Sequence, residues 1–352
     1  MSRIEQSWQT RDWFARLLWP ISLVYGLLLR LRRLAYERGL IKRHDSRLPV
    51  IVVGNLSVGG TGKTPLCATL VERFQRAGWR PAIVSRGYGG TRHEQAYLLN
   101  AEDTAATAGD EPVMLYRQTG VPVCVCVNRA AAVEYLAEHT DANLIFSDDG
   151  LQHLAMARTA DIMVFDGIRG LGNGWLLPAG PLRESAQQIA SADLVAIQLP
   201  FTGNGNEVVG NLHQSLRQGD VGNVLQASSQ QCFQLVPAEL LNLVSGHSLT
   251  LDSLRGQRVH AVAGIGNPQR FFNSLEAAGL LVEPHPLPDH HEFTLADVSF
   301  SDDMPVLVTA KDAVKLTGLT DLPHSVHEVR TRVNLSVELA AAIDNLEQSL
   351  RE

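Results

Sequence analysis

A glycine-rich turn that ends in Lys-Thr is the part of this sequence best suited to chemistry on phosphate. It runs from Gly59 through Gly60, Thr61, Gly62 and Lys63 to Thr64, directly after the apolar stretch Pro49–Val53. Glycines let backbone N–H groups close around phosphate oxygens, and the helix expected after the turn points its positive end at them. Lys63 would reach the β- and γ-phosphates, and Thr64 would ligate Mg²⁺. The spacing predicts a P-loop that binds a nucleoside triphosphate.

One position departs from the general P-loop pattern. Ser57 stands where the first glycine of G-x-x-x-x-G-K-[ST] is expected. A glycine-rich turn that precedes Lys-Thr by chance is the structural alternative, but the apolar strand before the turn and the helix after it favour the P-loop. The expected nucleotide-binding residues are Ser57, Val58, Gly59, Gly60, Thr61, Gly62, Lys63 and Thr64.

Two adjacent carboxylates follow another apolar stretch. The predicted strand Asn143–Ser147 ends in Asp148 and Asp149, before a glycine. An acidic residue at the carboxyl end of a strand beside the P-loop strand holds Mg²⁺ directly or through water. A helix cap is the structural alternative. The turn continues into Gln152 and His153, so it also presents an amide and an imidazole.

Apolar stretches alternate with helix-like stretches after the P-loop, as in a parallel sheet covered by helices on both faces. The predicted helices include Thr64–Ala77 and Arg129–His139. The predicted strands are Pro81–Ser85, Val121–Val127, Asn143–Ser147, Asp161–Asp166 and Asp193–Gln198. We therefore predict an α/β fold of the P-loop NTPase type, with a doubly wound, mainly parallel sheet and a second, smaller α/β domain.

The chain length of 352 residues allows one large domain or two ordinary ones. From Phe201 to Gly222 the sequence is rich in Gly, Asn and Gln, which favours a boundary there. We expect a membrane-associating segment over 1–45, the P-loop core over 46–222 and the smaller domain over 223–352. The elements predicted for the smaller domain are strands near Arg258–Ala263, Pro305–Thr309 and Ser325–Val329 and a last helix from about Ser336 to Leu350. A cleft between two such domains suits an enzyme with two substrates.

The first 50 residues differ in charge from the rest of the chain. They hold ten Arg/Lys against four Asp/Glu, whereas the whole chain has a net charge of −7. The 13 residues Leu17–Leu29 carry no charge, and a cluster of basic residues follows them. As a helix they would cover about 20 Å, less than the ~30 Å hydrocarbon core, and Pro20 weakens a straight spanning helix. We expect a shallow membrane anchor, with a buried core helix as the alternative.

The cysteines indicate a reducing compartment. Their spacing fits no metal site, and we expect free, buried thiols at Cys67, Cys124, Cys126 and Cys232.

Several short motifs occur in a fixed order along nearly the whole chain. They are Asn55–Pro65, Ser85–Gly89, Gly109–Pro112, Asp148–His153, Asn173–Gly174, Leu177–Glu184, Gly264–Pro268 and Asp289–His291. Together with the apolar amino-terminal segment, they closely resemble the tetraacyldisaccharide 4'-kinases, which belong to the lipid A pathway of Gram-negative bacteria. Serine at position 57 also agrees with the pattern of that family.

The resemblance implies an activity. It is the ATP-dependent phosphorylation of the 4'-hydroxyl of a tetraacylated glucosamine disaccharide 1-phosphate, which gives lipid IVA at the cytoplasmic face of the inner membrane. ATP and Mg²⁺ are the implied cofactors. The lipid substrate and the membrane surface are the implied partners, and neither a nucleic acid nor a protein partner is implied.

The resemblance also implies roles for individual residues. Asp110 would orient and deprotonate the sugar hydroxyl, with a helix cap as the structural alternative. His290 would be its partner, with His291 as the alternative, and Lys63 would complete the catalytic set. Because this histidine lies in the second domain, catalysis would require closure between the domains. The expected Mg²⁺ ligands are Thr64, Asp148, Asp149 and Glu184. The expected substrate-binding residues are Arg86, Tyr88, Asn128, Arg129, Gln152, His153 and Arg183.

Two other classes of protein compete with a lipid kinase. A nucleotide-dependent switch or metallochaperone GTPase would carry a guanine-reading Asn-Lys-x-Asp signature, and the first domain contains none. A kinase of soluble small molecules would use the first helix as buried core.

Overall fold

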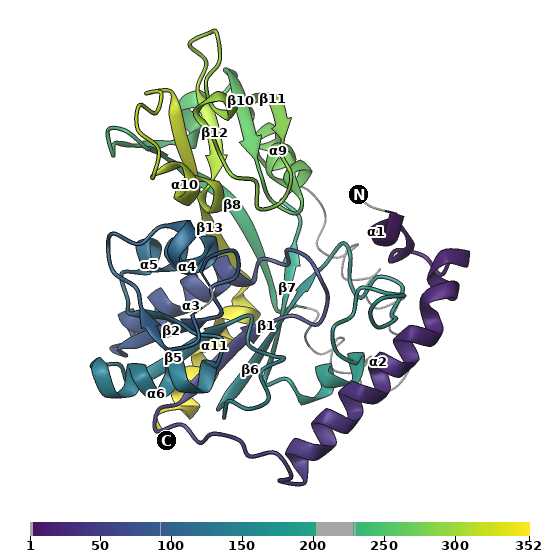
Figure 1. Cartoon of the computed structure of the whole chain (residues 1–352). Coiled ribbons are helices and arrows are strands. Elements are labelled where there is room, and N and C mark those ends of the chain that lie inside the picture. The colour runs from purple at the N-terminus through teal and green to yellow at the C-terminus, as the bar shows by residue number, and fades with distance from the viewer. Residues whose placement is uncertain (1–2, 92, 202–227, 229) are drawn as a thin grey trace.

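The computed structural model describes residues 3–91, 93–201, 228 and 230–352 of this chain. The first strands are β1 (Val50–Gly54), β2 (Pro81–Ser85), β3 (Tyr97–Leu98), β4 (Val123–Val125), β5 (Leu144–Asp148), β6 (Ala160–Asp166) and β7 (Leu194–Leu199). The later strands are β8 (Cys232–Asn242), β9 (Ser248–Thr250), β10 (Arg258–Ala263), β11 (Leu281–Pro286), β12 (Val306–Thr309) and β13 (Val326–Leu335). Within the described residues they form one sheet in the order β11-β10-β12-β13-β8-β7-β6-β1-β5-β2-β4-β3, with β9 paired to β8 (Figure 1).

The helices follow the sequence pattern closely. The α-helices are α1 (Arg3–Ser7), α2 (Trp13–Glu37), α3 (Lys63–Arg76), α4 (Ala105–Ala108), α5 (Asp110–Thr119), α6 (Arg129–His139), α9 (Pro268–Ala277), α10 (Ala310–Leu316) and α11 (Val337–Ser349). Short 3-10 helices are η1 (Ala186–Ser191), η2 (Leu251–Leu254) and η3 (Leu295–Asp297). The predicted strands and helices occur with bounds shifted by one or two residues, except that the strand predicted over Ser325–Val329 continues to Leu335.

The central strands are apolar throughout because both faces of the sheet are covered. In β1, Ile51 and Val53 pack into a core with Leu66 of α3. Val50 and Val52 pack into a second core on the opposite face, which also holds α6. The strand β1 runs parallel to β5 and β6, and β2 runs parallel to β5 and β4. The predicted α/β fold with a doubly covered, mainly parallel sheet is confirmed.

Two long strands join the halves of the molecule. The strand β8 pairs with β7 in parallel and with β13 in antiparallel fashion. The antiparallel pairing extends from Phe233 opposite Leu335 to Asn242 opposite His327. Figure 1 shows both strands running from the lower half of the molecule into the upper half. We call β1–β7 with α3–α6 and α11 the P-loop lobe, and β9–β12 with α9 and α10 the second lobe.

The last helix packs on the P-loop lobe although it follows the second lobe in sequence. Leu339 and Ile343 of α11 join the core cluster that contains α3, and Asp344 lies 2.6 Å from Arg73 of α3. The boundary expected near Gly222 lies outside the described residues, so the division into 46–222 and 223–352 remains a prediction. The structure shows that the sequence order alone does not separate the two lobes.

The helix α2 is longer than the apolar stretch suggested. It has 25 residues, about 37 Å of helix, and Pro20 lies inside it. It is the one helix of the described residues that is long and apolar enough to cross a membrane. The helix thus continues through Pro20 and well beyond the 13 uncharged residues, so the length of about 20 Å expected for the apolar stretch is too short. The shallow membrane anchor stays a prediction. Only 17% of its most apolar window is buried, which contradicts the alternative of a buried core helix.

One face of α2 is nevertheless attached to the P-loop lobe. Ser22 donates to the carbonyl of Leu176 and accepts from the N–H of Ala179, at 2.9 and 3.0 Å. Tyr25 donates to the carbonyl of Arg183 at 3.0 Å. All four cysteines are buried thiols outside disulfide bonds, as expected.

Candidate active site

The P-loop begins at the end of β1 and is fixed by a second segment of the chain. The N–H of Val58 donates to the carbonyl of Pro181 at 2.9 Å. The N–H of Arg183 donates to the carbonyl of Leu56 at 2.6 Å. Ser57 forms a β-bridge with Leu182. The motif Leu177–Glu184 is thus an outer support of the loop. The loop ends at Gly62, which has a positive φ of 77° and is the N-cap of α3, so a residue with a Cβ would be strained there.

The predicted pairing of β1 with the acidic strand is confirmed, because Val53 lies opposite Asp148 in the parallel register. The hydroxyl of Thr64 donates to Oδ2 of Asp148 at 3.0 Å. The Oδ1 atom of Asp148 is buried and has no hydrogen-bond partner. Burial, reinforced by Glu111, raises the pKa of Asp148 to about 7. A hydroxyl and an unsatisfied carboxylate oxygen beside a P-loop fit Mg²⁺, which takes few protein oxygens and completes its shell with water and nucleotide phosphate.

Asp149 holds the P-loop lysine rather than an open metal position. Its carboxylate accepts two bonds from Arg183, at 3.0 and 3.1 Å, and lies 3.7 Å from Nζ of Lys63. Burial acts to raise the pKa of Asp149, but Lys63 and Arg183 outweigh it and lower the pKa to about 2. Arg183 also donates to the side-chain oxygen of Asn55. The carboxylate therefore stays charged and orients both cations.

Glu184, the fourth expected Mg²⁺ ligand, forms an ion pair with the amino-terminal helix. Its carboxylate lies 3.9 Å from Arg33 of α2. Burial raises its pKa, with Arg33 and Arg32 opposing the shift. In the described part of the chain, no group of three or more His, Cys, Asp or Glu side chains is arranged to hold a metal ion. The structure thus brings Thr64 and Asp148 together and assigns Glu184 to the contact between α2 and the lobe.

Basic residues gather around His153. Burial lowers the pKa of this histidine to about 3, with Arg129, Arg86 and Arg32 adding to the shift. The imidazole is therefore neutral at physiological pH. Arg129 is 3% exposed and donates to the hydroxyl of Ser147 at 2.9 Å. Burial lowers its pKa to about 10.

The remaining expected substrate-binding residues differ in exposure to solvent and in their hydrogen bonds within the fold. Arg86 is exposed, and Tyr88 is 68% exposed. Gln152 donates its amide to the carbonyl of Asn55 at 3.2 Å. Asn128 caps α6 by accepting from two backbone N–H groups, so its side-chain oxygen is already used within the fold.

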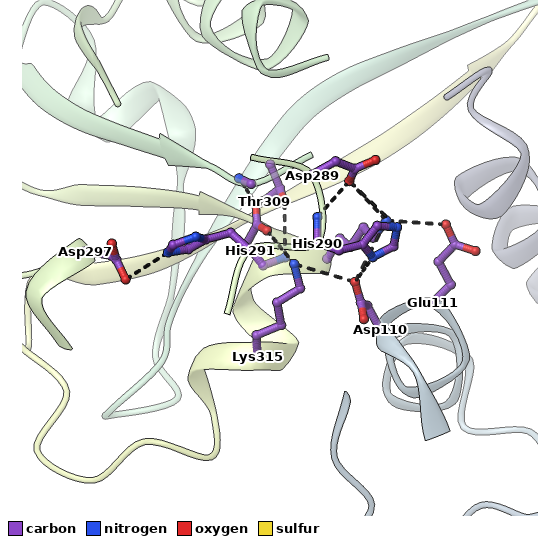
Figure 2. Close-up of polar contacts among 11 residues, drawn as sticks. Asp110, Glu111, Asp289, His290, His291, Asp297, Thr309 and Lys315 are labelled. Atoms are coloured by element: carbon purple, nitrogen blue, oxygen red, sulfur yellow. Dashed lines mark hydrogen bonds and ion pairs between the residues drawn. The ribbon is translucent and has the colours of Figure 1, made fainter. Parts of the chain in front are cut away.

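Asp110 and His290 come together from different lobes. Asp110 is the first residue of α5 and is 4% exposed. Its Oδ2 lies 3.2 Å from Nδ1 of His290, which follows β11 in the second lobe. Figure 2 shows these two side chains pointing toward each other. His291 points away and pairs with Asp297 at 3.2 Å. The structure thus selects His290 over the alternative His291 as the neighbour of Asp110.

Two lysines and a glycine-rich loop complete the surroundings of this pair. Lys315 and Lys311 of α10 lie 3.6 and 3.9 Å from Oδ2 of Asp110. The ring centroids of Tyr88 and His290 are 5.1 Å apart. Gly89 has a positive φ of 85°, and a Cβ there would stand 3.2 Å from Oδ1 of Asp110, so a residue other than glycine would be strained at this position.

The sequence reasoning missed several residues of the site. Asn55, Ser147 and Lys315 contact functional side chains, and Asp166 ends β6 beside the P-loop. A polar residue at the carboxyl end of a predicted strand was the available signal for Asn55 and Asp166. Lys315 had no such signal, because its contact depends on α10 of the second lobe.

The fold and the P-loop define a class of protein: a P-loop phosphotransferase with a second lobe whose His290 meets Asp110 of the P-loop lobe. The family model described as tetraacyldisaccharide-1-P 4'-kinase matches residues 14–351. The chain belongs to this family. It is 43% identical to the tetraacyldisaccharide 4'-kinase of Alkalilimnicola ehrlichii, over 91% of this chain and 89% of that protein. It is also 43% identical to the enzyme of that name from Xanthomonas campestris pv. campestris, over 93% and 89%.

A solved structure supports the same assignment. The structure of LpxK from Aquifex aeolicus in complex with ATP superposes with a TM-score of 0.73 at 26% identity, over 95% of this chain and 99% of that chain. The resemblance stated from the sequence motifs is thus confirmed at the level of the family.

Proposed function

We propose that this chain transfers the γ-phosphoryl group of ATP to the 4'-hydroxyl of a tetraacyldisaccharide 1-phosphate and so forms lipid IVA in lipid A biosynthesis. The contact of Asp110 with His290 carries the proposal, because it joins a carboxylate of the P-loop lobe to an imidazole of the second lobe, and the neighbouring Glu111 acts on Asp148 beside the P-loop. The names of the relatives and the ATP complex of the neighbouring structure support it.

The direct test uses the full chain in detergent micelles with Mg²⁺ and ATP labelled on the γ-phosphate. The label should pass to the purified disaccharide 1-phosphate, and only when that lipid is present. Release of labelled inorganic phosphate without lipid phosphorylation would contradict the proposal.

Asp110 and His290 act together on the acceptor hydroxyl in this mechanism. Phosphoryl transfer has a loose transition state, so the hydroxyl needs orientation and late removal of its proton. Asp110 is nearly buried and fixes the imidazole through Nδ1, whereas His290 is more open, with 34% of its side chain exposed. Lys311 and Lys315 keep the carboxylate beside cations. The pair therefore shares the proton that leaves the hydroxyl.

Thr64 and Asp148 are the proposed protein ligands of Mg²⁺. When bound, the ion would neutralise charge on the β- and γ-phosphates. We expect Asp148→Asn to raise the Mg²⁺ concentration needed for half-maximal activity by roughly tenfold or more, because an amide offers a dipole where a hard cation prefers a charge. Titration of Mg²⁺ at saturating ATP measures this, with the exposed Asp141→Asn as control. An unchanged Mg²⁺ dependence would move the metal to other ligands.

The arginines around His153 are the proposed binding site for the anionic phosphate of the lipid. Arg86 and Arg32 are the exposed members of this group, and Arg129 is buried. Guanidinium groups bind phosphate with two parallel hydrogen bonds. A neutral His153 adds no further charge and can accept or donate a hydrogen bond to the sugar.

The helix α2 is the proposed anchor to the inner membrane at its cytoplasmic face. Its exposed apolar residues recur at helical spacing on one side: Trp13, Leu17, Val24, Leu28 and Leu31, each between 53% and 65% exposed. Arginines follow at positions 30, 32 and 33. An apolar stripe beside basic residues binds at the interface of anionic bilayers.

The anchor is tested with the triple variant Leu17→Glu, Val24→Glu and Leu28→Glu. We expect binding to vesicles that contain phosphatidylglycerol to fall by roughly 100-fold or more, because burial of each side chain contributes about 1.5–3 kcal/mol. Flotation of the full chain measures this. The matched control changes the exposed Leu249, Leu281 and Val337 to Glu and adds the same charge. Equal loss in both variants would show that charge alone, not the stripe, determines binding.

A further inference from the structure

A second contact between the lobes lies on the other side of the P-loop from Asp110 and His290. Asp166 ends β6, the neighbour of β1 on the side away from β5. Its Oδ2 lies 3.0 Å from Nη1 of Arg270, in α9 of the second lobe, and 3.3 Å from Nε of Arg169. The lobes therefore meet on both sides of the P-loop strand.

Arg169 lies directly on the P-loop. Its Nη2 donates to the carbonyl of Gly60 at 3.2 Å. Its Nη1 is 2.7 Å from the place where a Cβ on Gly59 would stand. These glycines belong to the loop that closes around phosphate oxygens. A guanidinium at this position is within reach of a phosphate chain held by the loop.

The charges at this contact are not balanced. Among the described residues, Asp166 is the single carboxylate within 4.0 Å of either guanidinium. Its Oδ1 already accepts from the N–H groups of Ile168 and Arg169, at 2.9 and 3.2 Å. Two cations thus share one anion. In addition, Nη2 of Arg270 is buried and has no hydrogen-bond partner. Burial lowers the pKa of Arg270, although Asp166 opposes this shift.

An anion between the two guanidiniums would balance the excess positive charge and give Nη2 of Arg270 a hydrogen-bond partner. We propose that Arg169 and Arg270 bind the terminal phosphates of the nucleotide as a pair, with Arg270 supplied by the second lobe. The inference rests on the proposed use of ATP. The γ-phosphate must lie between the P-loop and the hydroxyl held near Asp110, and the second lobe approaches the P-loop on both sides. Guanidiniums placed there stabilise the charge on the transferring group. Asp166 is then a positioning residue for both arginines.

The test compares binding of ATP and ADP by calorimetry, with turnover measured in parallel, on the full chain in micelles. We expect Arg270→Ala to weaken ATP binding by roughly 10- to 100-fold, the loss of a hydrogen bond between charged groups, and ADP binding by much less. Arg169→Ala should behave in the same way. Arg270→Lys keeps the charge but lacks the planar guanidinium group, so its affinity for ATP should lie between those of the wild type and Arg270→Ala. The control is Arg258→Ala, an exposed arginine of the second lobe.

The outcomes separate binding from a structural bridge between lobes. Equal losses for ATP and ADP, or a lower melting temperature with unchanged ATP affinity, would overturn the proposal and leave the arginines as a bridge. If the wild-type chain itself bound no ATP, the proposed function would fail instead. Normal ATP binding and turnover in both alanine variants would overturn only the role of the arginine pair.

Discussion

We expect replacement of Asp110 by alanine to lower kcat by about 10²–10⁴-fold, the usual contribution of a positioned general base, and to leave the affinity for ATP close to that of the wild type. The carboxylate lies next to His290, on the proposed acceptor side, and contacts no residue of the P-loop in the described structure. Steady-state kinetics with the lipid substrate, together with ATP binding, measure the two effects separately. Loss of ATP binding in this variant would return Asp110 to a helix-capping role.

The double variant of Asp110 and His290 tests whether the two residues act as one unit. Groups that work as one unit give non-additive losses. We expect His290→Ala to cost less than Asp110→Ala, because the latter also leaves Lys311 and Lys315 without their shared carboxylate. The double variant should be hardly worse than Asp110→Ala alone. His291→Ala is the matched control, since that ring pairs with Asp297. Multiplicative losses would show that the two residues act independently.

Replacement of Lys63 by alanine should reduce phosphoryl transfer by at least about 10²–10³-fold, in line with the loss of one preorganised group that stabilises the transition state. Lys63 is held 3.7 Å from Asp149, which Arg183 fixes from the other side. The ammonium is therefore positioned before any nucleotide arrives. Single-turnover kinetics at saturating ATP measure the chemical step.

The control for this variant is Arg76→Ala, which removes an exposed cation from the last turn of the same helix. Melting temperatures should show that both variants fold. If turnover of Lys63→Ala stayed within a few-fold of the wild type, the P-loop would have been misidentified.

Local patterns were sufficient to predict the strand, turn and helix of the P-loop and the pairing of its strand with the acidic strand. A strand, a glycine-rich turn and Lys-Thr are contiguous, and Asp148 ends a strand that any parallel sheet of this class places nearby. The partnership of Asp110 with His290 came from the family resemblance alone. These residues are 180 positions apart in sequence, and their contact depends on how the second lobe docks.

Ion pairs account for the parts that the sequence could not predict. Asp149 and Glu184 have the same chemistry as Asp148, yet Asp149 pairs with Lys63 and Arg183, and Glu184 pairs with Arg33 of α2. Which carboxylate remains open to a metal is decided by long-range neighbours. The length of α2 was underestimated for a different reason, since charged residues beyond its apolar stretch continue the helix.

The placement of α11 bears on how the chain folds during synthesis. The ribosome makes β1 and α3 early, but Leu339 and Ile343 complete their core only after the whole second lobe has been translated. At ~5–20 residues per second, the apolar side of α3 would remain partly uncovered for many seconds. A nascent chain arrested before α11 should therefore be more sensitive to protease within the P-loop lobe than the finished protein.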